Sequence, residues 1–178
     1  MNDDAGSLVP QASESETAVL SAILASDGGA LPSVLDMLTP DDFYHPANRE
    51  IYSAVLECWQ ANEPVELVAV SRRCRSSGTV APYGGVQYLS EIALSYCNPA
   101  AVGYYALAVL EASRKRSLKR GFENLAGSVN TIEADDLIAG AMNSLREVQD
   151  RLPPTGKVAL REIARDVFEN LERLREQE

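Results

Sequence analysis

The chain has 178 residues, 46% of them hydrophobic, which is enough to bury one sizeable core with an appendage. Its formal net charge is −10, and the first 50 positions hold nine of the 26 acidic residues but only one of the 16 basic residues, Arg49. A chain this acidic lacks the broad basic face that phosphate backbones require, so we expect weak or no direct nucleic-acid binding.

The N-terminal residues 1–12 include Asp3 and Asp4 and contain no basic or long apolar run. This pattern predicts a disordered tail, with neither a signal peptide nor a membrane span. The cysteines lack CxxC spacing and indicate reduced, buried thiols in a cytoplasmic protein; they are Cys58, Cys74 and Cys97.

The first expected helix begins at an S-x-x-E capping box formed by Ser13 and Glu16, and it ends near Asp27. Its buried stripe consists of apolar residues at helical spacing, namely Val19, Leu20, Ile23 and Leu24. A short helix from Pro32 through Leu38 follows.

Three further elements complete the N-terminal part. Thr39 caps a turn, and His45 with Pro46 opens a helix that ends before Pro64. Glu66 begins the next helix, which Gly78 closes in the left-handed conformation. After a loop at 79–85, one more helix ends at residue 97, and no strand is expected because period-2 alternation is confined to 64–70.

Two long helices then form a hairpin around the turn at 127–133. Asn98 caps the first helix and Pro99 fills its first position, while Glu133 and an acidic first turn begin the second, which ends near Leu152. The apolar stripes are wider than a two-helix contact can cover, which predicts a symmetric dimer. The interface residues expected from these stripes are Leu118, Phe122, Leu125, Leu137, Ile138, Ala141, Met142, Leu145 and Val148.

A basic cluster interrupts the first of these long helices. It is interpreted first as a solvated face, and alternatively as a contact for a partner. Its members are Arg114, Lys115, Arg116, Lys119 and Arg120.

The C-terminal residues 153–178 differ in kind from the rest. Two prolines detach an amphipathic helix whose apolar residues follow spacings of four and three over about two heptads, too short for a stable free coiled coil. We therefore expect this helix to dock on a neighbouring subunit or domain through Leu160, Ala164, Val167, Phe168, Leu171 and Leu174.

Sequence motifs for catalysis are missing. The chain contains no GxxxxGK[ST], GxGxxG or HExxH pattern. Asp41 and Asp42 with His45 could be imagined as metal ligands, but helix capping explains them, and no second base accompanies the single histidine. We expect no catalytic, cofactor-binding or metal-binding residue in this chain.

Together these elements predict an all-α protein made of a small helical globule, a long helical hairpin and a C-terminal linker helix. The expected boundaries are a disordered tail at 1–12, the globule at 13–97, the hairpin at 98–152 and the linker with its amphipathic helix at 153–178.

The order of five motifs resembles the N-terminal domain of DnaB-type replicative DNA helicases. These motifs are LTPDDFY at 38–44, HPANREI at 45–51, EPVELV at 63–68, GGVQYL at 84–89 and NPAAVGYY at 98–105. The resemblance covers residues 10 to about 152, and the terminal helix falls where that family has its interdomain linker helix.

The resemblance implies a non-catalytic collar domain. In that family, hairpins pair between subunits, three such dimers form a collar over a hexameric ring, the linker helix docks on the adjacent motor domain, and the collar recruits primase and supports loading of the ring. We therefore expect a homodimer, primase and a helicase loader as partners. ATP and Mg²⁺ are expected only for a motor domain that this chain lacks, since no phosphate-binding loop is present.

Two alternatives stay open. The helicase-binding domain of a primase has a similar architecture, although the motifs at 41–44 and 84–85 favour the helicase. A chain complete at 178 residues could instead be an acidic all-α loader or regulator protein.

Overall fold

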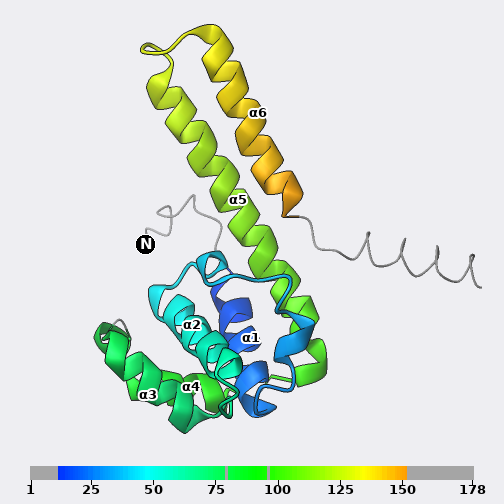
Figure 1. Cartoon of the computed structure of the whole chain (residues 1–178), viewed down its shortest axis with the longest axis vertical. Coiled ribbons are helices and arrows are strands. Elements are labelled where there is room, and N and C mark those ends of the chain that lie inside the picture. Colours follow the sequence, from blue (N-terminus) through cyan, green and yellow to red (C-terminus); the bar gives the residue numbers. More distant parts are fainter. Residues whose placement is uncertain (1–11, 79, 96, 152–178) are drawn as a thin grey trace, which may run out of the picture.

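The computed structural model describes residues 12–78, 80–95 and 97–151, and the regular structure within them is entirely helical. A small globule contains α1 to α4 and the first half of α5, and the second half of α5 projects from it beside α6 (Figure 1). The predicted all-α fold, with a globule followed by a hairpin, is confirmed. Of the expected tail at 1–12, residues 1–11 lie outside the described residues and Ala12 is the N-cap of α1, and the expected linker helix also lies outside the described residues.

The first helix, α1 (Ser13–Ala25), lies at the centre of the globule, where it contacts α2, α4 and α5. Its residues from 18 to 24 are buried, as the apolar stripe predicted. The predicted capping box is wrong: Ala12 is the N-cap, no side chain caps the helix, and Glu16 is fully buried. A capping-box glutamate would have to turn back over the helix end, whereas this one points into the globule.

Between α1 and the next long helix, the chain makes two turns of 3₁₀ helix, η1 (Leu31–Ser33) and η2 (Pro40–Asp42). The predicted helix from Pro32 to Leu38 is therefore shorter than expected, and hydrogen-bonded turns replace its second half. The predicted cap at Thr39 is confirmed, because the Asp42 carboxylate accepts bonds from the Thr39 backbone N (2.7 Å) and hydroxyl (2.9 Å).

Three helices close the other side of the globule: α2 (Pro46–Gln60), α3 (Leu67–Ser77) and α4 (Val86–Leu94), with the 3₁₀ turn η3 (Ala81–Tyr83) before α4. As predicted, Gly78 ends α3 in the left-handed region with φ of 72°, where a side chain would be strained.

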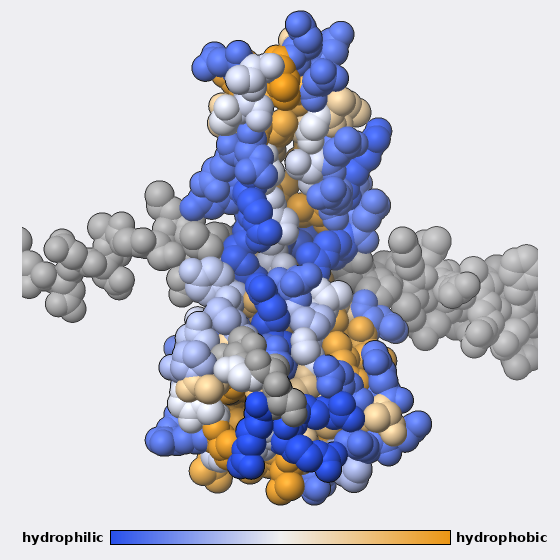
Figure 2. Space-filling view, turned by 60° about the vertical axis from the view of Figure 1, so that its left-hand side comes forward, coloured by the Kyte–Doolittle hydropathy of each residue, from blue (hydrophilic) through white to orange (hydrophobic). Residues whose placement is uncertain are grey.

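The hairpin starts as the sequence predicted. Asn98 Oδ1 accepts from the Ala100 backbone N (3.0 Å) at the 3₁₀ turn η4 (Pro99–Ala101), which leads directly into α5 (Val102–Ser128). The second helix, α6 (Ala134–Asp150), has Glu133 as its N-cap. The buried residues of α5 all lie between positions 102 and 116, and its later part packs beside α6. Hydrophobic side chains of this projecting part are visible between the two helices and at the tip (Figure 2).

Burial protects two of the three thiols. Cys58 and Cys74 are buried, Cys97 is half-buried, and burial raises the pKa of the Cys74 thiol to about 11. We expect a thiol reagent at pH 8 to modify Cys97 first, with Cys58 and Cys74 reacting only after unfolding. Because the folded-state pKa of Cys74 is raised, its contribution to stability should be complete below about pH 9 and decline towards pH 11. Equal labelling rates for all three cysteines in the native chain would contradict the expected order of thiol modification.

Candidate protein-interaction surface

A buried carboxylate joins α1 to the start of α2. Glu16 accepts hydrogen bonds from the backbone N of Tyr44 (2.6 Å) and of His45 (3.2 Å) and from Asn48 Nδ2 (2.9 Å). Asn48 in turn accepts from the Tyr88 hydroxyl (2.8 Å), which extends the network to α4. Burial, and next the charge of Glu16, raise the pKa of Tyr88, so this hydroxyl stays protonated and can donate.

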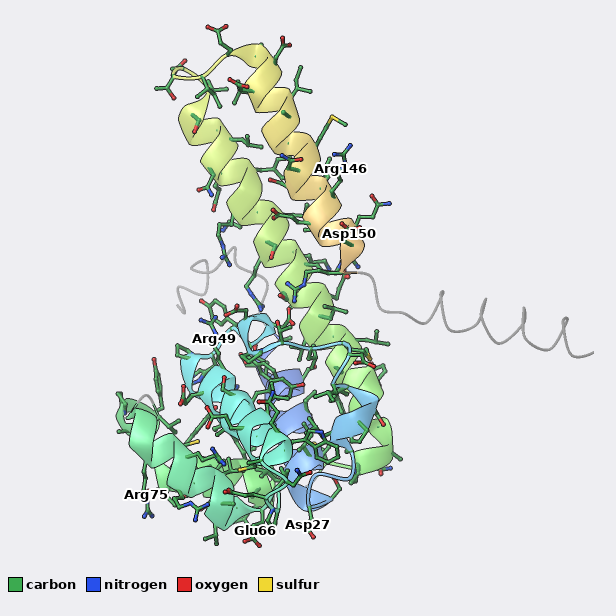
Figure 3. All side chains as sticks on the ribbon, viewed as in Figure 1. Asp27, Arg49, Glu66, Arg75, Arg146 and Asp150 are labelled. Atoms are coloured by element: carbon green, nitrogen blue, oxygen red, sulfur yellow. The ribbon has the colours of Figure 1, made fainter. Side chains whose placement is uncertain are left out.

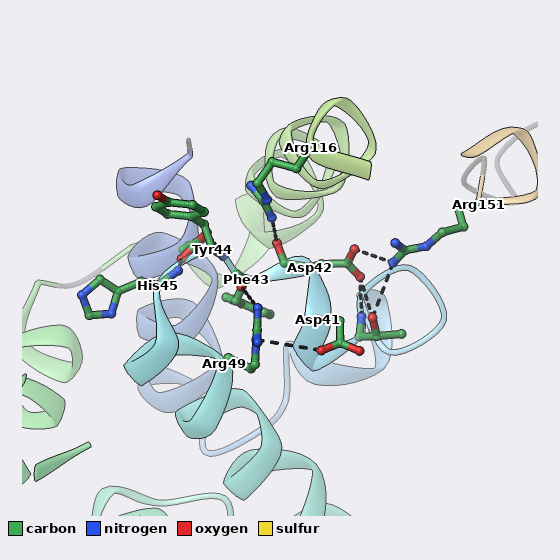
Figure 4. Close-up of polar contacts among 10 residues, drawn as sticks. Asp41, Asp42, Phe43, Tyr44, His45, Arg49, Arg116 and Arg151 are labelled. Atoms are coloured by element: carbon green, nitrogen blue, oxygen red, sulfur yellow. Dashed lines mark hydrogen bonds and ion pairs between the residues drawn. The ribbon is translucent and has the colours of Figure 1, made fainter. Parts of the chain in front are cut away.

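A second buried carboxylate, Asp42, ties the globule to the base of the hairpin. Its side chain is bonded to Thr39 and forms an ion pair with Arg151, which follows α6 (Figure 4). Its backbone carbonyl accepts from Arg116 of α5. Both hairpin helices are therefore anchored to the same 3₁₀ turn, which fixes the direction in which the hairpin projects.

The basic cluster of α5 divides into buried and exposed members. Arg116 is only 8% exposed and lies over the Tyr44 ring, 5.5 Å from its centroid. Burial, only partly offset by Glu16 and Asp42, lowers its pKa. The interpretation of Arg116 as a solvated residue is therefore wrong, because its guanidinium is used inside the molecule, and its contact with a partner stays a prediction.

The remaining basic residues of that cluster have local roles. Arg114 donates to the Val148 carbonyl (3.3 Å) and so joins α5 to α6. Lys115 pairs with Glu111 (3.3 Å) and Lys119 with Glu123 (3.6 Å), one helical turn apart in each case. Arg120 is exposed, so the solvated-face interpretation fits it.

Five of the nine predicted dimer residues are buried or half-buried where the two helices of the hairpin pack together. Val148 is buried, and four more are half-buried: Leu118, Leu125, Leu137 and Ala141. Glycines allow this close approach, since a Cβ built on Gly121 would meet Ser144 Oγ at 2.8 Å, and one on Gly140 would meet the Leu125 side chain at 2.8 Å. These positions form the seam within one chain.

The other four residues of the set are exposed. Phe122 is 47% exposed on α5, and the α6 residues Ile138, Met142 and Leu145, one helical turn apart, are 59%, 49% and 50% exposed. Two residues that the sequence interpretation missed, Val129 and Ile132, add exposed apolar surface at the turn. We call the four helical residues Phe122, Ile138, Met142 and Leu145 the hairpin face. Clustered apolar side chains of this kind are typical of a surface that binds another protein.

The close contact at Gly121 can be tested with a matched pair of substitutions. Gly103→Ala on α5 meets no atom within 4 Å, so we expect it to raise the free energy of unfolding by about 0.5–1 kcal/mol. Gly121→Ala has the same helical benefit but pushes against Ser144 Cβ at 3.0 Å, so we expect no gain or a loss of about 1 kcal/mol. Urea denaturation of both variants measures the difference, and an equal gain would contradict the seam.

Three further predictions concern the linker helix, a metal site and a membrane span. The expected docking residues of the linker helix, from Leu160 to Leu174, lie outside the described residues. In the described part of the chain, no group of three or more His, Cys, Asp or Glu residues could hold a metal ion. There too, no single helix is long and apolar enough to cross a membrane, and only the bent pair of Val86–Leu94 with Pro99–Ser128 passes on length and composition.

Comparison with protein families gives a match over most of the described residues. The family model described as "DnaB-like helicase N terminal domain" matches residues 8–111 of this chain. Among curated proteins, the Replicative DNA helicase DnaC of Bacillus subtilis is 34% identical over 169 residues, and the Replicative DNA helicase DnaB of Geobacillus stearothermophilus is 35% identical over 167. These matches cover 94% and 93% of this chain but 37% of each relative, so the chain spans little more than a third of their length.

Solved structures share the fold. The N-terminal domain of DnaB helicase from Mycobacterium tuberculosis superposes with a TM-score of 0.70 at 27% identity, covering 78% of this chain and 98% of that one. A structure described as a DnaB-like replicative helicase and its interactions with primase matches with a TM-score of 0.59 at 21% identity, covering 83% and 35% of the two chains. At that identity the second likeness concerns the fold alone.

Proposed function

This chain belongs to the family of DnaB-like helicase N-terminal domains, and from that premise we propose that it pairs with a second copy of itself through the hairpin face. The observation that carries the proposal is the exposed apolar stripe of Ile138, Met142 and Leu145 on a helix whose opposite side is already covered by α5. Three such dimers would form the collar of a hexameric replicative helicase. Membership in the helicase family also decides against the helicase-binding domain of a primase.

In this proposal the chain is not itself an enzyme. The relatives are replicative DNA helicases of which the chain spans 37%, and its sequence contains no phosphate-binding loop. We assign ATP and Mg²⁺ binding to a motor domain beyond this segment. The terminal helix predicted from the sequence, with Leu160 and Leu171 in its stripe, would dock on the motor of a neighbouring subunit.

We further propose primase as a partner of the assembled collar and a loader as a partner of the whole helicase. The support for primase is the shared fold with a helicase whose structure is described together with its interactions with primase. A titration that shows no binding of primase at micromolar concentrations, either to this chain or to the assembled ring, would remove that partner.

The experiment that tests the central proposal is the solution mass by light scattering over a concentration series. A dimer, twice the 19.3 kDa of one chain, is expected. A monomer at all concentrations would mean that the hairpin face has no self-complementary contact, and it would favour a different protein as the partner of that face.

A further inference from the structure

A polar hollow of about 280 Å³ lies between the globule and the hairpin, where η2 and the start of α2 meet α5. Four of its lining side chains are cationic: Arg49, Arg116, Lys119 and Arg120. The other lining side chains are those of Tyr44, Asp41 and Glu123. We call this site the arginine hollow. Its residues are distinct from the hairpin face, so the inference does not depend on the proposed dimer.

The positive charges of Arg49 and Arg120 are only partly compensated by the described residues. Arg49 Nε lies 3.9 Å from Asp41 Oδ1, at the limit of an ion pair, and that carboxylate is 87% exposed. Lys119 pairs with Glu123 at 3.6 Å, in a contact that solvent weakens. Arg120 forms no hydrogen bond or ion pair with the residues that the structure describes.

Contacts within the protein hold the arginine side chains of the hollow in place. Arg116 is buried beneath the hollow, where it donates to the Asp42 carbonyl and lies over the Tyr44 ring. Arg49 is held in turn by the Phe43 carbonyl (3.2 Å). Burial lowers the pKa of Arg116 and the charges of Glu16 and Asp42 partly offset that effect, while Arg120 and Arg49 lie close enough to lower it further, so the guanidinium groups are neighbours in the hollow. A bound anion would relieve the repulsion between them.

We propose that the arginine hollow binds the terminal phosphate of a nucleotide. Two guanidinium groups from different helices can donate to phosphate oxygens: Arg120 with its planar donor fork, and Arg49 with the N–H groups that Phe43 and Asp41 do not use. Lys119 adds a point charge. The ring of Tyr44 is 39% exposed at the same place and can contact the base. A long nucleic-acid strand fits less well, because Asp41 and Glu123 flank the site and the chain carries a net charge of −10.

The test is a titration of the whole chain, at low salt, followed by NMR of the arginine Nε–Hε signals. The probes are AMP, inorganic phosphate, phosphoserine and a deoxythymidine decamer without a terminal phosphate. We expect AMP to shift the signals of Arg49 and Arg120 and to bind more tightly than phosphate or phosphoserine, with binding that weakens as sodium chloride is added. Loss of one charge-assisted contact should weaken binding at least about tenfold.

The matched variants are Arg49→Ala with Arg120→Ala, against Arg75→Ala as the control. Arg49 and Arg120 are exposed, so their replacement should leave the fold intact, and Arg75 is an exposed arginine on α3 away from Arg49 (Figure 3). The double variant should lose AMP binding and the control should keep it. Equal binding by all three proteins, phosphoserine or phosphate as tight as AMP, or tighter binding of the decamer would each overturn the assignment to a nucleotide phosphate.

Discussion

Replacing Glu16 by Leu is expected to lower the free energy of unfolding by about 3–5 kcal/mol. The substitution places an apolar side chain at a fully buried position of α1 but leaves three donors without an acceptor: the backbone N of Tyr44, the backbone N of His45, and Asn48 Nδ2. A buried donor that loses its partner costs about 1–3 kcal/mol, and the three losses occur together. Urea denaturation followed by circular dichroism measures the change.

Two further variants make this result specific. Glu16→Gln retains one acceptor oxygen and should cost less than Glu16→Leu, about 1–2 kcal/mol. Glu14→Leu introduces the same apolar side chain two residues earlier, at an exposed position, and should stay within about 0.5 kcal/mol of the parent chain. If Glu14→Leu and Glu16→Leu were equally destabilising, the buried network would not be what stabilises the globule.

The second large effect is expected from charges placed on the hairpin face. Ile138→Asp together with Leu145→Asp should convert the proposed dimer to a monomer, weakening association on the order of a thousandfold, because two carboxylates would be buried without partners. Both side chains are at least half exposed in one chain, so the hairpin itself should remain folded. Light scattering measures the mass, and circular dichroism checks the helix content.

The control for that experiment is Asn143→Asp, which adds the same charge at an exposed position on another side of α6. It should leave the mass unchanged, whereas Leu145→Asp alone should reduce it at low concentration. Leu137 is unsuitable for this test because it is half-buried against α5, where a charge would loosen the hairpin itself. An unchanged mass for the double variant would exclude the hairpin face as the dimer contact.

The beginnings and ends of helices could be read from the sequence because their causes are local. Asn98 accepts from a backbone N two residues later, Thr39 is bonded to Asp42 three residues later, and Gly78 adopts a left-handed conformation that depends on its own lack of a side chain. The same local reasoning failed at Glu16, since an S-x-x-E pattern at a helix start fits a capping box whether or not the glutamate finds a partner elsewhere.

The hairpin residues likewise could be predicted from the sequence only in part. The apolar periodicity of α5 and α6 identified the residues of the hairpin, but it did not separate Leu125 and Val148, which lie in the seam, from Ile138 and Met142, which face solvent. A stripe wider than one contact contains both kinds of residue. The rotation of each helix about its own axis, which turns Gly121 towards Ser144 and Gly140 towards Leu125, decides which residues lie in the seam.

By itself, the sequence determined that this protein is helical, where most helices begin and end, and that its hairpin carries more apolar surface than one chain can cover. The tertiary structure alone decided the partners of the buried charges. Glu16 bonds to Tyr44, Arg116 to Asp42 and Arg151 to Asp42, across 28, 74 and 109 positions respectively. Patterns within one or two helical turns report on neighbours along the chain, whereas a buried carboxylate is stabilised by whichever donors the packing of distant segments brings to it.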